Sequence, residues 1–177
     1  GTFNHNSGTV SFSTAGTTLQ NIAGSQSIIF NNLIINNSGG ATDVTNAMTP
    51  PATISLLGTL SFGENNSVFD ADGGGGLDFI LLSTNDSPTA DARIGAITTA
   101  GSNITGNFTV QRFVSSEGSG RFYRYIASPV VGATVADLQN AIPVTGTFAD
   151  PSVCAGCIST NPSLFFYNET TNAYVAY

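Results

Sequence analysis

The residues most able to bind a ligand lie in the segment DADGGGGLD at positions 70–78. Calcium requires several oxygen ligands, and Asp-x-Asp-Gly supplies two carboxylates on a single turn. The segment therefore predicts a calcium loop with Asp70, Asp72 and Asp78 as ligands. A complete EF-hand loop also needs an oxygen donor at the third ligand position, which here is Gly74. The alternative is a glycine-rich hairpin with solvated aspartates.

Cys154 and Cys157 form the sequence Cys-Ala-Gly-Cys. This spacing is typical of a redox pair in a βαβ protein, but no parallel α/β pattern accompanies it. With one histidine in the chain, at position 5, ligands for structural zinc are too few. In an exported protein the spacing predicts a local disulfide, which is the pairing we expect.

The sequence does not favour catalysis. A nucleophile–histidine–acid triad would have to use His5, which lies in an Asn-His-Asn segment typical of a turn, and no Gly-x-Ser-x-Gly elbow accompanies it. The acids between Asp43 and Asp91 are scattered and the chain has no Trp, so a paired-carboxylate glycosidase is disfavoured. We therefore expect no enzyme, no catalytic residues, and no cofactor other than calcium at the 70–78 loop.

The amino-acid composition argues against nucleic acid and anionic membranes as binding partners. The 177 residues are 41% hydrophobic, enough for a packed core, but only 8% are charged. The net charge is −7, and the basic residues are four arginines with no lysine. Such a chain is a poor ligand for nucleic acid or for anionic membranes. No apolar run reaches the ~18 residues of a membrane-spanning helix.

Short apolar runs bounded by Asn, Gly, Ser and Thr occupy the first two thirds of the chain and predict β-strands. The strands are expected at 9–13, 27–30, 33–36, 54–57, 59–62, 68–69, 77–82, 93–98 and 108–113. The first groups repeat after roughly 20 residues, close to the coil length of solenoid repeats. The pattern predicts an all-β, parallel β-helix-like solenoid, and a β-sandwich is the alternative.

The sequence changes character near Ser115. The segment SSEGSG predicts a flexible joint, so we expect a solenoid domain at 1–114 and a partial second β module at 120–177. A helix is expected at about 134–142, with Thr134 as N-cap, Asp137 in the first turn and Pro143 ending it. Both ends of the chain interrupt a strand-like pattern, which favours a piece of a longer secreted protein.

Several phrases resemble a known group of proteins. They are SFGENNSVFDADGGGGLDFILLSTNDSPTADARIGAI, NITGNFTVQRFV and RFYRYIASPV. They resemble a module of large secreted Bacteroidetes proteins that carry a C-terminal sorting domain for the type IX secretion system. The opening GTFNHNSGTVSFS resembles the Asn/Thr-rich repeats that precede this module, and YNETTNAYVAY resembles the strand pair that follows it. The resemblance implies a cell-surface or released adhesin-like protein with β-solenoid repeats, and it implies no activity.

Together these features predict a non-catalytic, extracellular structural or adhesive segment of a bacterial cell-surface adhesin or fibre. The expected partners are neighbouring modules of the same polypeptide or identical subunits, with surface glycans as a further candidate. The alternative function is a carbohydrate-binding module of a secreted polysaccharide-degrading enzyme. That alternative requires an exposed row of aromatic side chains on one face. The sequence names no ligand.

Overall fold

The computed structural model describes residues 3–14, 18–37, 42–85, 87, 89–114, 125–126, 128, 131–142, 144–147, 156–158 and 160–177. The chain divides into two compact units, residues 1–122 (unit 1) and 123–177 (unit 2). The domain limits expected from the sequence, 114 and 120, remain predictions. Each unit is described by itself.

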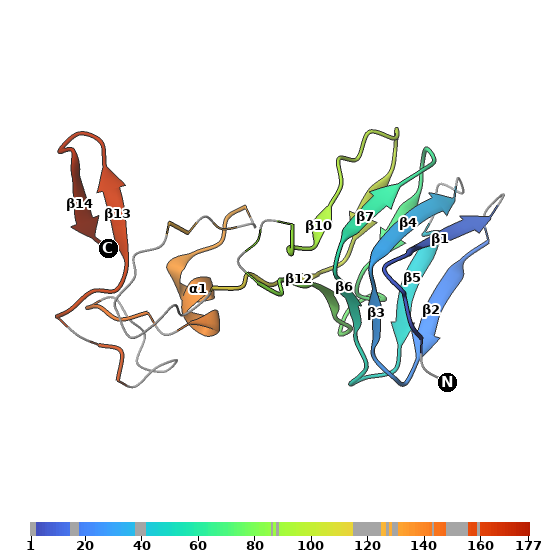
Figure 1. Ribbon diagram of the computed structural model, residues 1–177, viewed down its shortest axis with the longest axis horizontal. Helices are drawn as coiled ribbons and strands as arrows, with labels where there is room; N and C mark the ends of the chain where they lie inside the picture. The colour runs from blue at the N-terminus through green and yellow to red at the C-terminus, as the bar shows by residue number, and fades with distance from the viewer. Residues whose placement is uncertain are drawn as a thin grey trace. The chain divides into compact units, whose positions relative to one another are not determined.

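In the described part of unit 1, short strands form three parallel four-stranded sheets (Figure 1). Sheet A holds β1 (Thr9–Thr14), β4 (Asn32–Asn37), β7 (Thr59–Phe62) and β10 (Arg93–Ile94). Sheet B holds β2 (Gln20–Gly24), β5 (Val44–Met48), β8 (Val68–Asp70) and β11 (Asn103–Thr105). Sheet C holds β3 (Ile28–Phe30), β6 (Ile54–Leu56), β9 (Phe79–Leu81) and β12 (Thr109–Val110). The chain visits A, B and C in turn, so it winds through four coils, and the predicted β-solenoid is confirmed.

The coils are longer than the predicted repeat of roughly 20 residues. Thr9 lies opposite Asn32, 23 residues later, and Leu33 lies opposite Leu60, 27 residues later. The predicted repeat was too short because one coil must contain three strands and three corners. The next spacing is longer still, since the corner 82–92 between β9 and β10 replaces the short corner 57–58 between β6 and β7.

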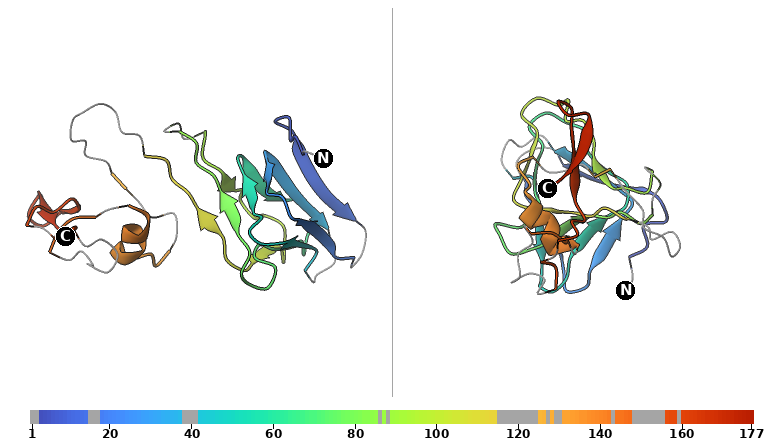
Figure 2. Two further views of the ribbon diagram at one scale, coloured as in Figure 1. Left: turned by 90° about the horizontal axis from the view of Figure 1, so that it is seen from below. Right: turned by 90° about the vertical axis from the view of Figure 1, so that its left-hand side faces the viewer.

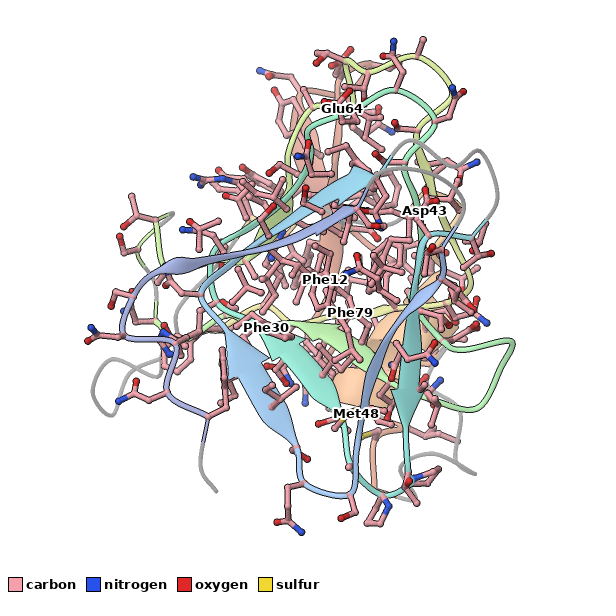
Figure 3. All side chains as sticks on the ribbon, turned by 90° about the vertical axis from the view of Figure 1, so that its right-hand side faces the viewer. Phe12, Phe30, Asp43, Met48, Glu64 and Phe79 are labelled. Carbon is pink, nitrogen blue, oxygen red and sulfur yellow. The ribbon has the colours of Figure 1, made fainter. Side chains whose placement is uncertain are left out.

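The core is a set of side-chain columns that run from coil to coil. Alternate strand residues point inward, and the parallel register places each inward residue over its equivalent in the next coil. The columns are Val10–Leu33–Leu60–Ile94, Phe12–Ile35–Phe62, Val44–Phe69–Ile104, Ile28–Ile54–Phe79 and Phe30–Leu56–Leu81–Val110. Figure 3 shows Phe12, Phe30, Phe79 and Met48 inside the coil. The members in the middle coils are buried, except Phe62, which is partly buried.

Most strands of sheets A and C coincide with the predicted runs, although several are shorter. In sheet B, the strands β2, β5 and β11 lie where no strand was predicted. Their sequences are QNIAG, VTNAM and NIT, in which polar or small residues outnumber the large apolar ones. Their backbones pair with neighbouring coils all the same, because the inward positions Ile22, Val44 and Ile104 continue the core.

Unit 2 contains one described helix and one hairpin, which Figure 2 shows in two further views. The helix α1 (Val135–Ala141) begins after Thr134, as predicted. The Thr134 side chain accepts the Asp137 N–H, while the Asp137 carboxylate accepts the Thr134 N–H, which together form a capping box. Pro143 lies outside the described residues. The hairpin pairs β13 (Phe165–Asn168) with β14 (Ala173–Ala176) in antiparallel register. Of the helical residues that the structure describes, none forms a helix long and apolar enough to cross a membrane.

Candidate functional site

The predicted calcium loop connects β8 to β9 at the corner between sheets B and C. Gly73 to Gly76 all have positive φ, which lets the chain turn at this corner. Because β8 and β9 belong to different sheets and do not pair, the segment is not the glycine-rich hairpin given as the alternative. One carboxylate oxygen of Asp70 accepts the Gly73 N–H at 3.1 Å, and the other accepts the Thr45 hydroxyl at 2.9 Å. Asp70 therefore holds its own turn and also bonds to the preceding coil.

The side chains of Asp72 and Asp78 do not join Asp70. Asp72 is 6% exposed, and its Oδ2 accepts the N–H of Asn107, in the fourth coil, at 2.8 Å. Asp78 has an exposed side chain, while its carbonyl oxygen accepts the Ile54 N–H at 3.1 Å. Within the described residues no three His, Cys, Asp or Glu side chains are grouped as metal ligands.

The calcium loop stays a prediction. Thermal melting with and without millimolar calcium tests it. A rise in melting temperature would support it, and no shift would remove it.

Asn46 is a structural residue that the sequence did not single out. It is 1% exposed and points inward from β5. Its side-chain amide donates to the carbonyls of Ala71 at 2.9 Å and Asp78 at 3.3 Å, so it holds both ends of the 71–78 loop. Its Oδ1 accepts the Met48 N–H at 3.2 Å. The only signal in the sequence is an Asn at an inward position of a strand, which has meaning only once the strand is known.

The corner between sheets A and B is held by a second group of buried polar residues. Asp43 is 1% exposed, and its Oδ2 accepts the N–H of Val68, in the next coil, at 2.8 Å. Asn37 is fully buried, and its Oδ1 accepts the Thr14 N–H of the preceding coil at 2.8 Å. The Ser67 hydroxyl, also buried, donates to the Asn37 carbonyl oxygen. Buried polar groups need such partners because an unbonded one is costly. Figure 3 labels Asp43 and Glu64 near this corner.

We call these polar residues inter-coil clamps: side chains at or beside the corners that hydrogen-bond the backbone of a neighbouring coil. They join residues between 23 and 38 positions apart. Amide N–H groups held in this way belong to Thr14, Thr53, Thr59, Ser67, Val68, Ala100, Asn107 and Phe113. The clamps continue the backbone ladder where the strands end.

His5 lies in a turn, as its neighbours predicted. Its carbonyl oxygen accepts the Gly8 N–H at 2.7 Å, and its Nδ1 accepts the Ser7 N–H at 3.0 Å. A groove of about 700 Å³ runs between residues 3–5 and 23–29. Its described lining consists of the His5 imidazole, hydroxyls, amides and apolar groups.

Several aromatic residues of unit 1 are in the core, whereas Phe3, Phe108 and Phe113 are between 39% and 47% exposed. Phe30 and Phe79 are 2% and 1% exposed, and Phe12 and Phe62 pack against the core. Phe3 is half exposed and meets the Phe30 ring edge-on, with ring centroids 5.4 Å apart. The exposed aromatic row that carbohydrate binding requires is not formed by Phe3, Phe12, Phe30, Phe62 and Phe79.

Unit 2 carries exposed aromatic side chains, among them Tyr125, Tyr167 and Tyr174. The Tyr167 and Tyr174 rings pack edge-on with centroids 5.3 Å apart, and both are about half exposed. The hydroxyl groups of Tyr125 and Tyr174 are 2.5 Å apart. This hydrogen bond raises the pKa of Tyr174 above its ordinary value. Tyr174 is therefore neutral at physiological pH.

Cys157 is disulfide-bonded. Its predicted partner Cys154 lies outside the described residues, so the Cys154–Cys157 pairing stays a prediction.

No protein-family model matches the chain, and no curated protein or solved structure is significantly similar to it. The resemblance to type IX secretion proteins therefore remains a hypothesis.

Proposed function

We propose that unit 1 is a structural segment that carries load between its ends, as a non-catalytic stalk or repeat of an extracellular adhesin or fibre. The observation that carries this proposal is that acidic side chains hydrogen-bond to neighbouring coils. Asp43, Asp70 and Asp72, the acids best placed for chemistry, each hydrogen-bond a neighbouring coil. Residues that an enzyme would keep free for a substrate are here engaged in holding the stack together.

The core columns and the low charge support the same role. Each coil contacts only its neighbours, so stability in such a stack is a sum of coil and interface terms that extends along the axis. The clamps add hydrogen bonds at the corners, where a backbone ladder between strands alone would be weakest. Because only 8% of the residues are charged, the polar residues on the outer faces of the coils are mainly Asn, Ser and Thr.

We also propose that the protein works outside the cell, at a bacterial surface. The disulfide at Cys157 supports this location, because disulfides persist in oxidising compartments. The resemblance to secreted surface proteins points the same way. Partners in this setting are neighbouring modules or identical subunits.

Single-molecule stretching of the full chain, held by tags at its two termini, tests the load-bearing role. We expect unit 1 to release in coil-sized steps. A coil of 23–27 residues spans about 80–90 Å when extended at ~3.4 Å per residue. Asp43→Ala and Asn46→Ala should lower the force of the steps that free the second and third coils, because they remove clamps between those coils.

Ser11→Ala is the matched control, since Ser11 is exposed on β1. It should leave the steps and their forces unchanged. Extension of unit 1 without resolvable steps, or forces that do not respond to loss of the clamps, would contradict the proposal.

A further inference from the structure

Three tyrosines of unit 2 gather at the hairpin of β13 and β14. Tyr167 and Tyr174 lie directly opposite each other on the two strands, with ring centroids 5.3 Å apart. Tyr125 lies 49 positions before Tyr174, and the hydroxyl groups of these two residues form a hydrogen bond at 2.5 Å. The cluster therefore connects the hairpin to a segment that is distant in the sequence.

Within this cluster, Tyr125 and Tyr174 are the two residues whose hydroxyl groups meet. The Tyr167 hydroxyl donates instead to Oδ1 of Asn172, in the turn of the hairpin. The carbons at which an oxidised phenol reacts lie ortho to the hydroxyl group, two bonds from its oxygen. Two hydroxyl oxygens in contact therefore bring the ortho carbons of Tyr125 and Tyr174 close enough to meet after a small rotation of the side chains.

Both side chains are accessible from solvent. Tyr125 is 92% exposed and Tyr174 is 57% exposed, so an oxidising enzyme can reach either ring. Unit 2 also contains an oxidative crosslink already, because Cys157 is disulfide-bonded. Access for an oxidant and a phenol partner on the same chain are the two conditions for joining tyrosines within one molecule.

We propose that Tyr125 and Tyr174 form an oxidative crosslinking site, at which a peroxide-driven haem peroxidase joins the two rings by a carbon–carbon bond. Each phenol loses one electron and one proton, and the two radicals couple at their ortho carbons. The hydrogen on each of these carbons then moves to the hydroxyl oxygen, which restores both aromatic phenols. One molecule of hydrogen peroxide takes up the two electrons and two protons and becomes two molecules of water.

The new bond closes a loop of the chain between positions 125 and 174. A covalent crosslink of this span restricts the unfolded chain and so stabilises the folded unit. A two-stranded hairpin is marginally stable by itself, so β13 and β14 gain from being tied to a second segment. The modification goes beyond the load-bearing role and involves no residue of unit 1, so either proposal can fail without the other.

Oxidation of the full chain, in dilute solution with a haem peroxidase and hydrogen peroxide, tests the proposal. Wild type should gain the blue fluorescence of dityrosine, and the mass of the monomer should fall by two hydrogen atoms. Treatment with a thiol reductant should leave this product intact, because it cleaves disulfides and not carbon–carbon bonds. Tandem mass spectrometry of a digest should find the peptides that contain Tyr125 and Tyr174 joined.

Tyr125→Phe and Tyr174→Phe should each abolish this product, because each removes one of the two phenols. Both variants keep the aromatic ring and should fold, which circular dichroism checks. Tyr177→Phe is the matched control, since Tyr177 is 56% exposed, and it should leave the yield unchanged. Absence of dityrosine, a crosslink that maps to other tyrosines, one formed only between chains, or a yield that survives Tyr125→Phe or Tyr174→Phe would each overturn the proposal.

Discussion

At the scale of single residues, three polar side chains, those of Asp43, Asn46 and Asp72, act as inter-coil clamps. The sequence shows that Asp43, Asn46 and Asp72 are present, but it cannot show their partners. Those partners are backbone groups in another coil, 25 or more positions away along the chain. The aspartates of the 70–78 loop suggested calcium because their spacing is local. The structure adds the Thr45 and Asn107 donors, which only the coil register brings near.

Loss of the Asn46 side chain should strongly destabilise unit 1. Asn46→Ala leaves the buried carbonyl of Ala71 and the N–H of Met48 without their partner. We expect a loss of about 2–3 kcal/mol in the free energy of unfolding, measured by urea denaturation. Asn21→Ala, at an exposed position of the adjacent strand β2, should change it by no more than about 0.5 kcal/mol. Equal effects of the two substitutions would contradict the role of Asn46.

At the scale of elements, apolar runs in the sequence predicted most strands of sheets A and C. Most strands of sheet B lack such runs and were not predicted. β4 reads NLIINN and β9 reads FIL, so their strand propensity is visible in the sequence. β5 reads VTNAM, and it forms a strand because β2 pairs with it along its length. Helix α1 was predictable because its capping signals are local. Elements that depend on a neighbouring coil could not be read from the sequence alone.

The short corner between β6 and β7 should require glycine at position 58. A Cβ at Gly58 would lie 2.6 Å from the Asn31 carbonyl oxygen and 2.4 Å from Oδ1 of Asn32, the atom that accepts the Thr59 N–H. Gly58→Ala should therefore cost about 1–3 kcal/mol in unfolding free energy. At Gly24 the nearest atom is the Met48 Cε at 3.9 Å, so Gly24→Ala is the control and should be tolerated. Equal melting temperatures for the two variants would show that the corner is not tightly packed.

The capping box of α1 should make the helix sensitive to acid. Hydrogen bonds from the Thr134 backbone and side chain lower the pKa of Asp137. The stabilisation from the carboxylate is thus present above its unfolded pKa and is lost as the pH falls through the lowered folded value. Cα chemical shifts of residues 135–141 should move toward coil values on acidification. In the Asp137→Ala variant, these Cα chemical shifts should already be closer to coil values before acidification. They should also change less as the pH falls. Wild-type shifts that stay constant down to strongly acidic pH would argue against the box.

At the scale of the whole unit, the stack explains why so few charges suffice. Backbone ladders, core columns and clamps all run in one direction, from coil to coil, and none of them needs an ion pair. Among the residues that the structure describes, Arg112 and Asp91 form an ion pair with a long contact of 3.9 Å. Raised salt should therefore change the unfolding free energy of unit 1 little, because screening acts on exposed charges.

Native-state hydrogen exchange, read amide by amide, tests the clamps most directly. The N–H groups of Thr59, Val68 and Asn107 bond to side chains of a neighbouring coil. They should exchange as slowly as amides within the ladders of β5 and β6. Asp43→Ala should speed exchange at Val68 more than at Asn107, and Asp72→Ala should do the reverse. Exchange at these amides as fast as in a free peptide would contradict the account that inter-coil clamps hold the solenoid together.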